Sequence, residues 1–381
     1  MVVDSETRNK IREEALIGTS HRALSRKYNI STSTVSRIRN EKLPQDVNFK
    51  SGFRPNDPLV RSDAIAFIRK HKQGVTLEQL ASKINTNVEN AQKVIEHLSH
   101  HDGYNLIPKK DTWLLSAVLK PVEKLELTRL LGKEYIYGIV TDTQLCNYNE
   151  RLDVLEAAYE EFQRRGVKEV FHAGNMIDGE FRYNQYELHA HGAHDQALYV
   201  ADHYPQKDGI KTYFITGECH EGWFQSREGI KIGWYIQKVC EDAGRNDMIY
   251  IGHVEQDVVI KQKFGETRIR IMHPGGGSPY ALSYPSQKMV ESFQGGDKPH
   301  ILILGHYHKF DFSYPREVAT IIAGCVEDQT TFMRKNKIAA HVGFLICKVG
   351  MRVDGTIGRC NVEWYPFYDR AYHRKLEEYE L

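Results

Sequence analysis

The stretch 301–308, which reads Ile-Leu-Ile-Leu-Gly-His-Tyr-His, decides the fold of this chain. Four consecutive apolar residues predict a buried strand, and a Gly-His-x-His sequence follows directly. Gly305 allows the backbone to turn sharply where the strand ends. Two imidazoles one residue apart, those of His306 and His308, could then each reach a different ion of a close metal pair. By itself the motif is equally compatible with two loop histidines that make ordinary hydrogen bonds, so further ligands must be sought upstream.

Polar residues of ligand type follow four other apolar runs, each of which predicts a strand. The run 135–140 leads into Asp142 and Gln144, and the run 167–171 leads into Asn175. The run 212–215 leads into Glu218, Cys219, His220 and Glu221, and the run 269–272 leads into His273. An amphipathic helix predicted over 150–165 separates the first two runs. This alternation indicates an α/β fold that gathers its ligands at the carboxyl ends of the strands.

In the order and spacing of these motifs, the chain resembles the calcineurin-like metallophosphoesterase superfamily from about residue 134 onward. The successive motifs of that superfamily are Asp-x-His, Gly-Asp, Gly-Asn-His followed by Asp or Glu, a lone His, and Gly-His-x-His. The resemblance implies a metallophosphoesterase-like β-sandwich flanked by helices, a two-ion site, and phosphoester hydrolysis by a metal-activated water.

Three positions depart from the superfamily pattern. Gln144 stands in place of the histidine of the first motif, and Asn175 replaces the aspartate that would bridge two ions. The third motif has one extra residue, so either Glu218 or Cys219 occupies the position of the asparagine ligand. A neutral amide binds a cation less tightly than a carboxylate does, so reduced metal affinity is expected.

The resemblance divides the metal ligands between two sites. The first comprises Asp142, Gln144, Asn175 and His308, and the second comprises His273 and His306 with Cys219 or Glu218. Because the second set is better furnished, unequal occupancy by one or two divalent ions is expected, with Mn, Zn or Fe as candidates. His220 matches the histidine that contacts the phosphate and assists the leaving oxygen, and Glu221 could orient it.

Length and composition constrain the rest. The chain has 381 residues, enough for two or three domains, and a net charge of +1. Residues 1–60 contain 11 Lys and Arg against 7 Asp and Glu, which predicts a polyanionic partner such as DNA. The six cysteines show no disulfide framework, and no apolar run is long enough to span a bilayer. A cytoplasmic protein without a membrane segment is therefore expected.

Residues 1–42 are predicted to form a helix-turn-helix domain that resembles those of recombinases and transposase-like regulators. Its second helix, over 33–40, would bury Val35 and Ile38. The opposite face of that helix is expected to contact DNA through Thr34, Ser36, Arg37 and Arg39. The alternative is a small packing bundle whose arginines are solvated.

Residues 43–60, which contain three prolines, predict a linker, and residues 61–120 predict a winged-helix-like domain. Three helical patterns, the second of them with Thr76 as a candidate N-cap, precede two strand patterns. These five patterns cover 62–71, 77–84, 88–99, 104–107 and 112–115. Lys109 and Lys110 at the tip of the wing would meet phosphates, although acidic residues on the helices favour a protein-docking role equally.

Together these patterns predict an α/β chain with two small, mainly helical N-terminal domains and a metallophosphoesterase domain over 130–381. The expected function is that of a DNA-binding, metal-dependent phosphoesterase, a phosphodiesterase or nuclease that acts on nucleic acid. The alternative is a catalytically inactive DNA-binding regulator or replication-associated scaffold, because three ligand positions are altered. The winged-helix unit or a terminal helix over 365–381 is a candidate surface for a protein partner or a second copy of the chain.

Overall fold

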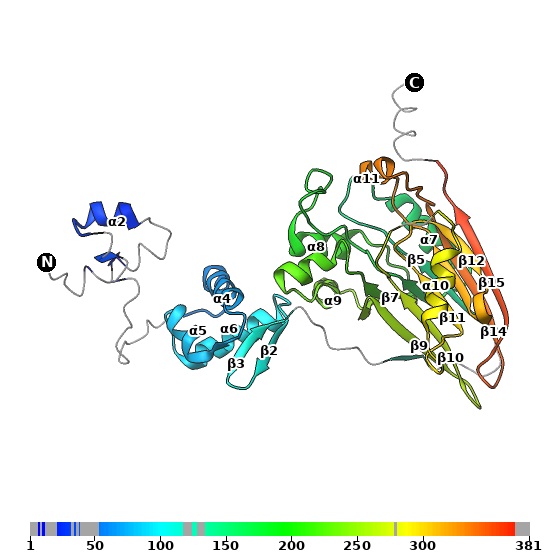
Figure 1. Ribbon diagram of the computed structural model, residues 1–381, viewed down its shortest axis with the longest axis horizontal. Helices are drawn as coiled ribbons and strands as arrows, with labels where there is room; N and C mark the ends of the chain where they lie inside the picture. Colours follow the sequence, from blue (N-terminus) through cyan, green and yellow to red (C-terminus); the bar gives the residue numbers. More distant parts are fainter. Residues whose placement is uncertain are drawn as a thin grey trace, which may run out of the picture. The chain divides into compact units, whose positions relative to one another are not determined.

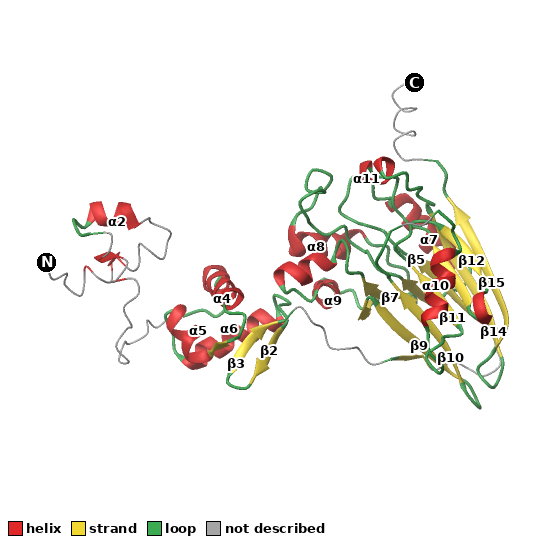
Figure 2. Cartoon of the chain, in the orientation of Figure 1, coloured by secondary structure: helices red, strands yellow, loops and turns green. Residues whose placement is uncertain are grey.

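The computed structural model describes residues 7, 10, 11, 21–31, 34, 35, 38, 53–116, 124–127, 134–277 and 280–369. The chain divides into two compact units, residues 1–97 with 108–114, and residues 98–107 with 115–381. Helices and strands are mixed along the chain, as Figure 2 shows, which confirms the expected α/β class. In the described ranges, no helix has both the length and the apolar character needed to cross a bilayer.

The smaller unit contains α2 (His21–Lys27). One cluster of apolar side chains is fully buried beside it and contains Ile11, Leu24, Val35 and Ile38. The inward placement expected for Val35 and Ile38 is therefore confirmed. The backbone N–H of Thr34 donates to Oγ of Ser31 at 3.0 Å, as at the start of a capped helix. The assignment of this region as a helix-turn-helix stays a prediction.

Three helices and a three-stranded sheet follow along the chain. They are α4 (Pro58–Lys70), β1 (Val75–Thr76), α5 (Leu77–Lys83), α6 (Val88–His100), β2 (Leu106–Lys109) and β3 (Thr112–Leu115), and the strand order is β1-β3-β2. The cap predicted at Thr76 is confirmed, because its side chain and that of Gln79 form a reciprocal capping box. Helix α4 begins inside the expected linker, since Asp57 caps it and Pro58 fits its first turn. The winged-helix assignment stays a prediction.

The larger unit is built on two six-stranded sheets, in the orders β12-β13-β11-β10-β9-β4 and β15-β14-β5-β6-β7-β8. The strands of the first sheet are β4 (Leu125–Leu127), β9 (Glu255–Lys261), β10 (Glu266–Met272), β11 (Ile301–Leu304), β12 (Phe310–Ser313) and β13 (Ala319–Ala323). Those of the second are β5 (Glu134–Val140), β6 (Glu169–His172), β7 (Lys211–Thr216), β8 (Met248–His253), β14 (Gly343–Met351) and β15 (Ile357–Pro366).

The terminal helix predicted from residue 365 is wrong at its start. Tyr365 and Pro366 belong to β15, where Tyr365 pairs with Phe344 of β14 and its ring stacks on the Phe344 ring at 4.7 Å between centroids. Alternating side chains of this edge strand favour pairing in the sheet over a helix. Residues 370–381 lie outside the described residues.

The two sheets pack face to face, and helices cover their outer faces (Figure 1). Side chains of both sheets, such as Tyr137 of β5 and Ile269 of β10, form one buried cluster between them. The second sheet is covered by α7 (Leu152–Arg164), α8 (Gly192–His203) and α9 (Ile232–Asp242), and the first by α10 (Tyr284–Ser292). Shorter helical turns lie at Phe224–Glu228, Pro315–Glu317 and, as α11, at Thr331–Lys335. These layers agree with the expected β-sandwich flanked by helices.

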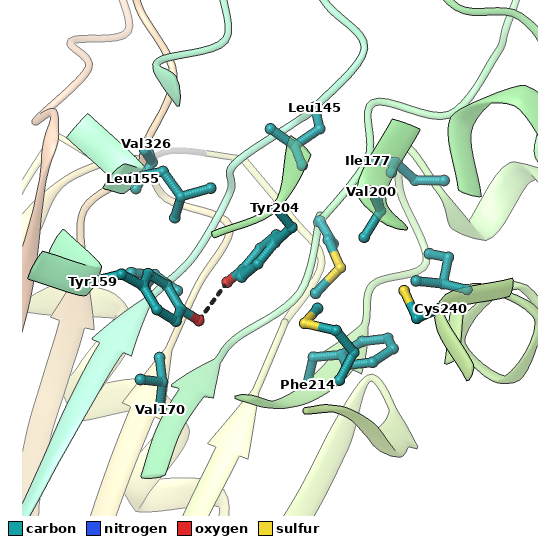
Figure 3. Close-up of a cluster of buried hydrophobic side chains, with 14 of the residues drawn as sticks. Leu145, Leu155, Tyr159, Val170, Ile177, Val200, Tyr204, Phe214, Cys240 and Val326 are labelled. Atoms are coloured by element: carbon teal, nitrogen blue, oxygen red, sulfur yellow. Dashed lines mark hydrogen bonds between the residues drawn. The ribbon is translucent and has the colours of Figure 1, made fainter. Parts of the chain in front are cut away.

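The core between the second sheet and its helices contains buried hydroxyl groups that bond to one another. Figure 3 shows the hydroxyl of Tyr159 on α7 donating to that of Tyr204, which follows α8, at 3.1 Å. The hydroxyl of Tyr159 lies 2.5 Å from Oγ1 of Thr212 on β7. Burying each large apolar side chain contributes about 1.5–3 kcal/mol. Packing of this kind holds the central strands rigidly, and therefore also the loops at their carboxyl ends.

Candidate active site

The carboxyl ends of five strands bring the predicted site residues together. β5, β6 and β7 are parallel neighbours in one sheet, and β10 and β11 are parallel neighbours in the other. The backbone is left-handed directly after several of these strands, with φ of 49° at Asp142, 53° at Asn175 and 54° at His308. Positive φ is uncommon outside glycine and concentrates at functional sites.

Asp142 is the centre of this site. Its carboxylate is fully buried, and Oδ1 accepts from Nδ2 of Asn175 and from Nε2 of His308, each at 3.2 Å. Oδ2 accepts from Oγ1 of Thr141 at 2.7 Å and from the backbone N–H of His306 at 2.8 Å. Loops that follow β5, β6 and β11 therefore meet at one carboxylate.

The charge of Asp142 is maintained by its neighbours. Burial would raise the pKa of this carboxyl, but the nearby imidazoles of His273 and His308 outweigh burial and lower it. Burial lowers the pKa of His273 to about 4, which favours its neutral form near pH 7, so at that pH the hydrogen bonds from His308 and Thr141 are what stabilise the charge of Asp142. A buried, ionised carboxylate beside a neutral imidazole is a site for a positively charged partner.

His273 and Asn175 present two unsatisfied acceptors beside Asp142. Nδ1 of His273 lies 2.7 Å from the carbonyl oxygen of Ala173, so Nδ1 carries the proton and Nε2 has a free lone pair. Among the described residues, neither Nε2 of His273 nor Oδ1 of Asn175 has a hydrogen-bond partner, although both are buried. Gly217 permits this approach, because a Cβ there would lie 2.7 Å from Oδ1 of Asn175.

Glu327 is a site residue that the sequence analysis missed. Its carboxylate is fully buried, and Oε2 lies 3.8 Å from Nδ1 of His308. The side-chain amide of Gln144 is oriented so that both its atoms have hydrogen-bond partners: its nitrogen donates to Oε1 of Glu327 at 2.6 Å, and its oxygen accepts from Nε2 of His220 at 3.2 Å. Glu327 follows β13, so the strand-end pattern used for the other five strands could have identified it.

His220 is paired with Asp178. Nδ1 of His220 donates to Oδ1 of Asp178 at 2.5 Å, and the side-chain amides of Asn147 and Asn184 donate to Oδ2 at 2.6 and 3.1 Å. Burial would lower the pKa of His220, but its bond to Asp178 outweighs burial and raises it. The four side chains form a buried network that fixes the orientation of one imidazole.

The expectation that Glu221 orients His220 is wrong. The Glu221 carboxylate points to the backbone instead, where Oε1 accepts from the N–H groups of Asn175 and Gly217, each at 2.9 Å, and Oε2 accepts from that of Ile177 at 3.2 Å. Burial raises its pKa to about 7 against these backbone donors. Glu221 thus ties the loop after β6 to the loop after β7, because one carboxylate accepts from both.

The ligands of the second predicted metal site are not gathered in the same way. Cys219 is half-buried and lines the cavity described below, whereas Glu218 is exposed and does not line it. Nε2 of His306 lies 2.6 Å from the carbonyl oxygen of Gly276, so in this arrangement it donates there, and not to the Asp142 carboxylate as Nε2 of His308 does. Burial also raises the pKa of the Cys219 thiol, which disfavours the thiolate that binds metals.

The donors fit one cation better than two. Nε2 of His273 lies 3.9 Å from Oδ1 of Asp142, and the unsatisfied oxygen of Asn175 is the third donor beside it, with His308 opposite. A cation there would satisfy both unpaired acceptors. In the described part of the chain, however, no three His, Cys, Asp or Glu side chains already form a complete ligand group.

A cavity of about 330 Å³ is lined by Asn175 and His308 of this group, whereas Asp142 and His273 are not among its lining residues. Its polar side includes Asn175, His220, His306 and His308. The lining also includes a set of apolar and aromatic side chains, which we call the apolar wall: Phe181, Tyr183, Phe332, Met333 and Ile338. The cavity therefore joins a set of imidazole and amide groups to an aromatic surface.

The predicted DNA-binding residues lie far from these strand ends in the sequence. Thr34 is half-buried and its hydroxyl lies 2.8 Å from that of Ser31, so it is already engaged. Ser36, Arg37 and Arg39 lie outside the described residues. Lys109 and Lys110 are both exposed. The first wing strand covers Leu106–Lys109 and not 104–107 as predicted, so Lys109 is its last residue and only Lys110 lies in the turn before β3.

No family model matches this sequence, and neither does any curated protein. Among solved structures, an archaeal phosphodiesterase is 13% identical with a TM-score of 0.33, over 60% of this chain and 99% of its own. A single mutant of Vps29 from Entamoeba histolytica is 13% identical with a TM-score of 0.28, over 60% and 99%. A 5'-nucleotidase precursor from Thermus thermophilus is 11% identical with a TM-score of 0.32, over 65% and 58%. Similarity at this level carries no inference about activity.

Proposed function

We propose that this protein is a metal-dependent phosphoesterase, a phosphodiesterase or nuclease that acts on nucleic acid. The observation that carries the proposal is the pair of unsatisfied buried acceptors on His273 and Asn175 beside the carboxylate of Asp142, next to a cavity that Asn175 and His220 line. Two buried acceptors without partners beside an ionised carboxylate suit a ligand that supplies positive charge.

A divalent cation, with Mn, Zn or Fe as candidates, would be held by Asp142, Asn175, His273 and His308. When bound, such an ion polarises a phosphoryl oxygen and lowers the pKa of a water molecule. The hydrogen bond from Nδ1 of His273 to Ala173 supports this role, because it orients Nε2 toward Asp142.

His220 is suited to act on the leaving oxygen of the ester. Asp178 accepts from its Nδ1, so its Nε2 is directed to the cavity side, where Gln144 contacts it. A substrate oxygen that replaced Gln144 at Nε2 would receive a hydrogen bond and then a proton as the ester bond breaks. Asp178 would act as a positioning residue, since it holds the imidazole without touching the substrate.

Nucleic acid is proposed as the substrate because of the charges outside the site. Residues 1–60 carry 11 Lys and Arg against 7 Asp and Glu, and Lys109 and Lys110 are exposed. Cationic segments of this kind bind phosphate backbones and would hold the polymer near the hydrolytic domain.

The second candidate function is that of an inactive DNA-binding regulator. It is favoured by one observation, the lack of a complete three-residue ligand group in the described ranges, together with the neutral amides at 144 and 175. In this alternative the polar cluster around Asp142 would have only a structural role.

Metal content and hydrolysis of bis(para-nitrophenyl) phosphate in manganese separate the two functions. We expect manganese-dependent hydrolysis that Asp142→Asn abolishes together with metal binding, and that His220→Ala abolishes with metal retained. His191→Ala is the matched control, because this imidazole is 54% exposed and pairs with Glu180. A metal-free protein, or a metal-loaded protein whose hydrolysis is the same in all three variants, would favour the regulator.

A further inference from the structure

The cavity is lined in part by aromatic side chains that the hydrolysis of a phosphoester does not require. Phe181 and Tyr183 come from the loop after β6, and Phe332 comes from α11, so separate parts of the chain supply one wall. Tyr183 is 83% exposed and Phe332 is 66% exposed. Large aromatic rings that remain open to solvent beside a polar site are typical of surfaces that take an aromatic ligand.

Phe181 connects this wall to the polar side. Its ring stacks on Trp223 with the centroids 5.9 Å apart, and it meets the imidazole of His220 edge to face at 5.6 Å. The guanidinium of Arg227 lies 4.2 Å from the centre of the Trp223 ring. Phe181 is therefore held between Trp223 and His220, so a ring that stacked on Phe181 would bind close to His220.

The charge of the cavity disfavours a ligand that brings many phosphates. Among the described residues that line it, none is a lysine or an arginine, while Asp178, Glu187 and Glu327 are acidic. Binding of duplex nucleic acid depends on neutralising many phosphates with such cations. Its bases are also stacked inside the helix, where a protein aromatic cannot reach them without unpairing.

The size of the cavity points the same way. A volume of about 330 Å³ is at the lower end of the range of about 300–1,000 Å³ for small-molecule sites. A site at this end of the range suits a ligand no larger than one nucleotide, and single bases are the units that stack on aromatic side chains in single strands.

We propose that Phe181, Tyr183 and Phe332 form a nucleobase subsite, so that the phosphate enters the site as part of a single unpaired nucleotide. The ligand of this subsite is a nucleoside phosphate, which either a free nucleotide ester or the end of a single strand would supply. As a substrate assignment this rests on the proposed function, but the binding step itself does not require hydrolysis.

The test measures binding of adenosine monophosphate and of ribose phosphate to the full chain, in EDTA and in manganese. We expect the nucleotide to bind at least about tenfold more tightly than ribose phosphate. The double variant Tyr183→Ala, Phe332→Ala should remove that preference, while Tyr183→Phe, Phe332→Tyr should retain it. Phe264→Ala is the matched control, since this ring is 71% exposed on the turn between β9 and β10. Equal binding of the two ligands, or a preference that survives the double alanine variant, would overturn the proposal.

Competition with longer ligands identifies the source of the nucleotide. A single-stranded oligomer that competes better than a dinucleotide supports a strand end, and equal competition supports a free ester. A blunt hairpin duplex that competes as well as the single strand contradicts the subsite.

The nucleobase subsite and the proposed hydrolytic function can fail separately. Nucleotide binding without hydrolysis of bis(para-nitrophenyl) phosphate removes the enzyme and keeps the subsite. Hydrolysis of bis(para-nitrophenyl) phosphate, together with a nucleotide preference that the double alanine variant leaves unchanged, removes the subsite and keeps the enzyme.

Discussion

Nδ1 of His220 lies 2.5 Å from Oδ1 of Asp178, whose carboxylate is almost fully buried and whose second oxygen accepts from two asparagine amides. His220 follows β7, and Asp178 follows β6. This pair fixes the direction in which Nε2 of His220 points, and with it the part of the cavity where a leaving oxygen would receive a proton.

Replacing Asp178 by Asn should lower kcat for phosphodiester hydrolysis by about 10- to 100-fold with little change in KM, because the imidazole loses its negative partner while the shape of the side chain is kept. Metal content should not change. Asp242→Asn is the control, since this carboxylate is 65% exposed and pairs with Lys238 on the same helix. A rise in KM with unchanged kcat would mean that Asp178 supports substrate binding and does not position His220.

Replacing Asn175 by Asp should make the stability of the protein depend on metal. Nδ2 of Asn175 now donates to Oδ1 of Asp142, and a second carboxylate at that place would repel the first. We expect the free energy of unfolding to fall by about 1–3 kcal/mol in EDTA and to recover in manganese. Thermal unfolding with and without manganese measures both effects.

Asn246→Asp serves as the control for that experiment, because Asn246 is exposed on the loop before β8. If Asn175→Asp unfolds at the same temperature in EDTA and in manganese, no cation binds beside Asp142. If it fills with metal and hydrolysis still stays at background, the regulator becomes the better description of the protein.

Replacing Glu221 by Gln should destabilise the fold by about 1–3 kcal/mol. The amide nitrogen of the new side chain would face a backbone N–H group among Asn175, Gly217 and Ile177, which all donate to Glu221 now. Chemical denaturation measures the loss. The neighbouring exposed substitution Glu218→Gln should change stability by less than about 0.5 kcal/mol. Equal effects of the two substitutions would contradict the loop-tying role of Glu221.

Replacing Arg37 and Arg39 together by Ala in the full chain should weaken binding of duplex DNA. Each arginine that contacts a phosphate contributes about 0.9 to the slope of log affinity against log salt, so the slope should become less steep by about 2. Fluorescence anisotropy over a series of salt concentrations measures it. An unchanged slope would remove this segment from the DNA interface.

Local sequence determined the elements on which the site stands. The apolar run 301–304 was sufficient to predict β11 at its observed bounds, because four buried residues followed by glycine leave few alternatives. Thr76 was identified as an N-cap for a similar reason, since its partner Gln79 is three residues away and the cap needs no tertiary contact. The positions of Asp142, Asn175, His273 and His308 at strand ends follow from the same local patterns.

Tertiary structure decided what those residues contact. The sequence suggested Glu221 as the partner of His220, whereas the structure pairs His220 with Asp178, because the partner depends on how the loops after β6 and β7 fold over each other. Glu327 reaches Gln144 from a distant part of the chain. Apolar periodicity and caps depend on neighbours within a few residues, so sequence carries them. Hydrogen bonds between loops depend on the packing of whole sheets and helices, which no short stretch of the chain specifies.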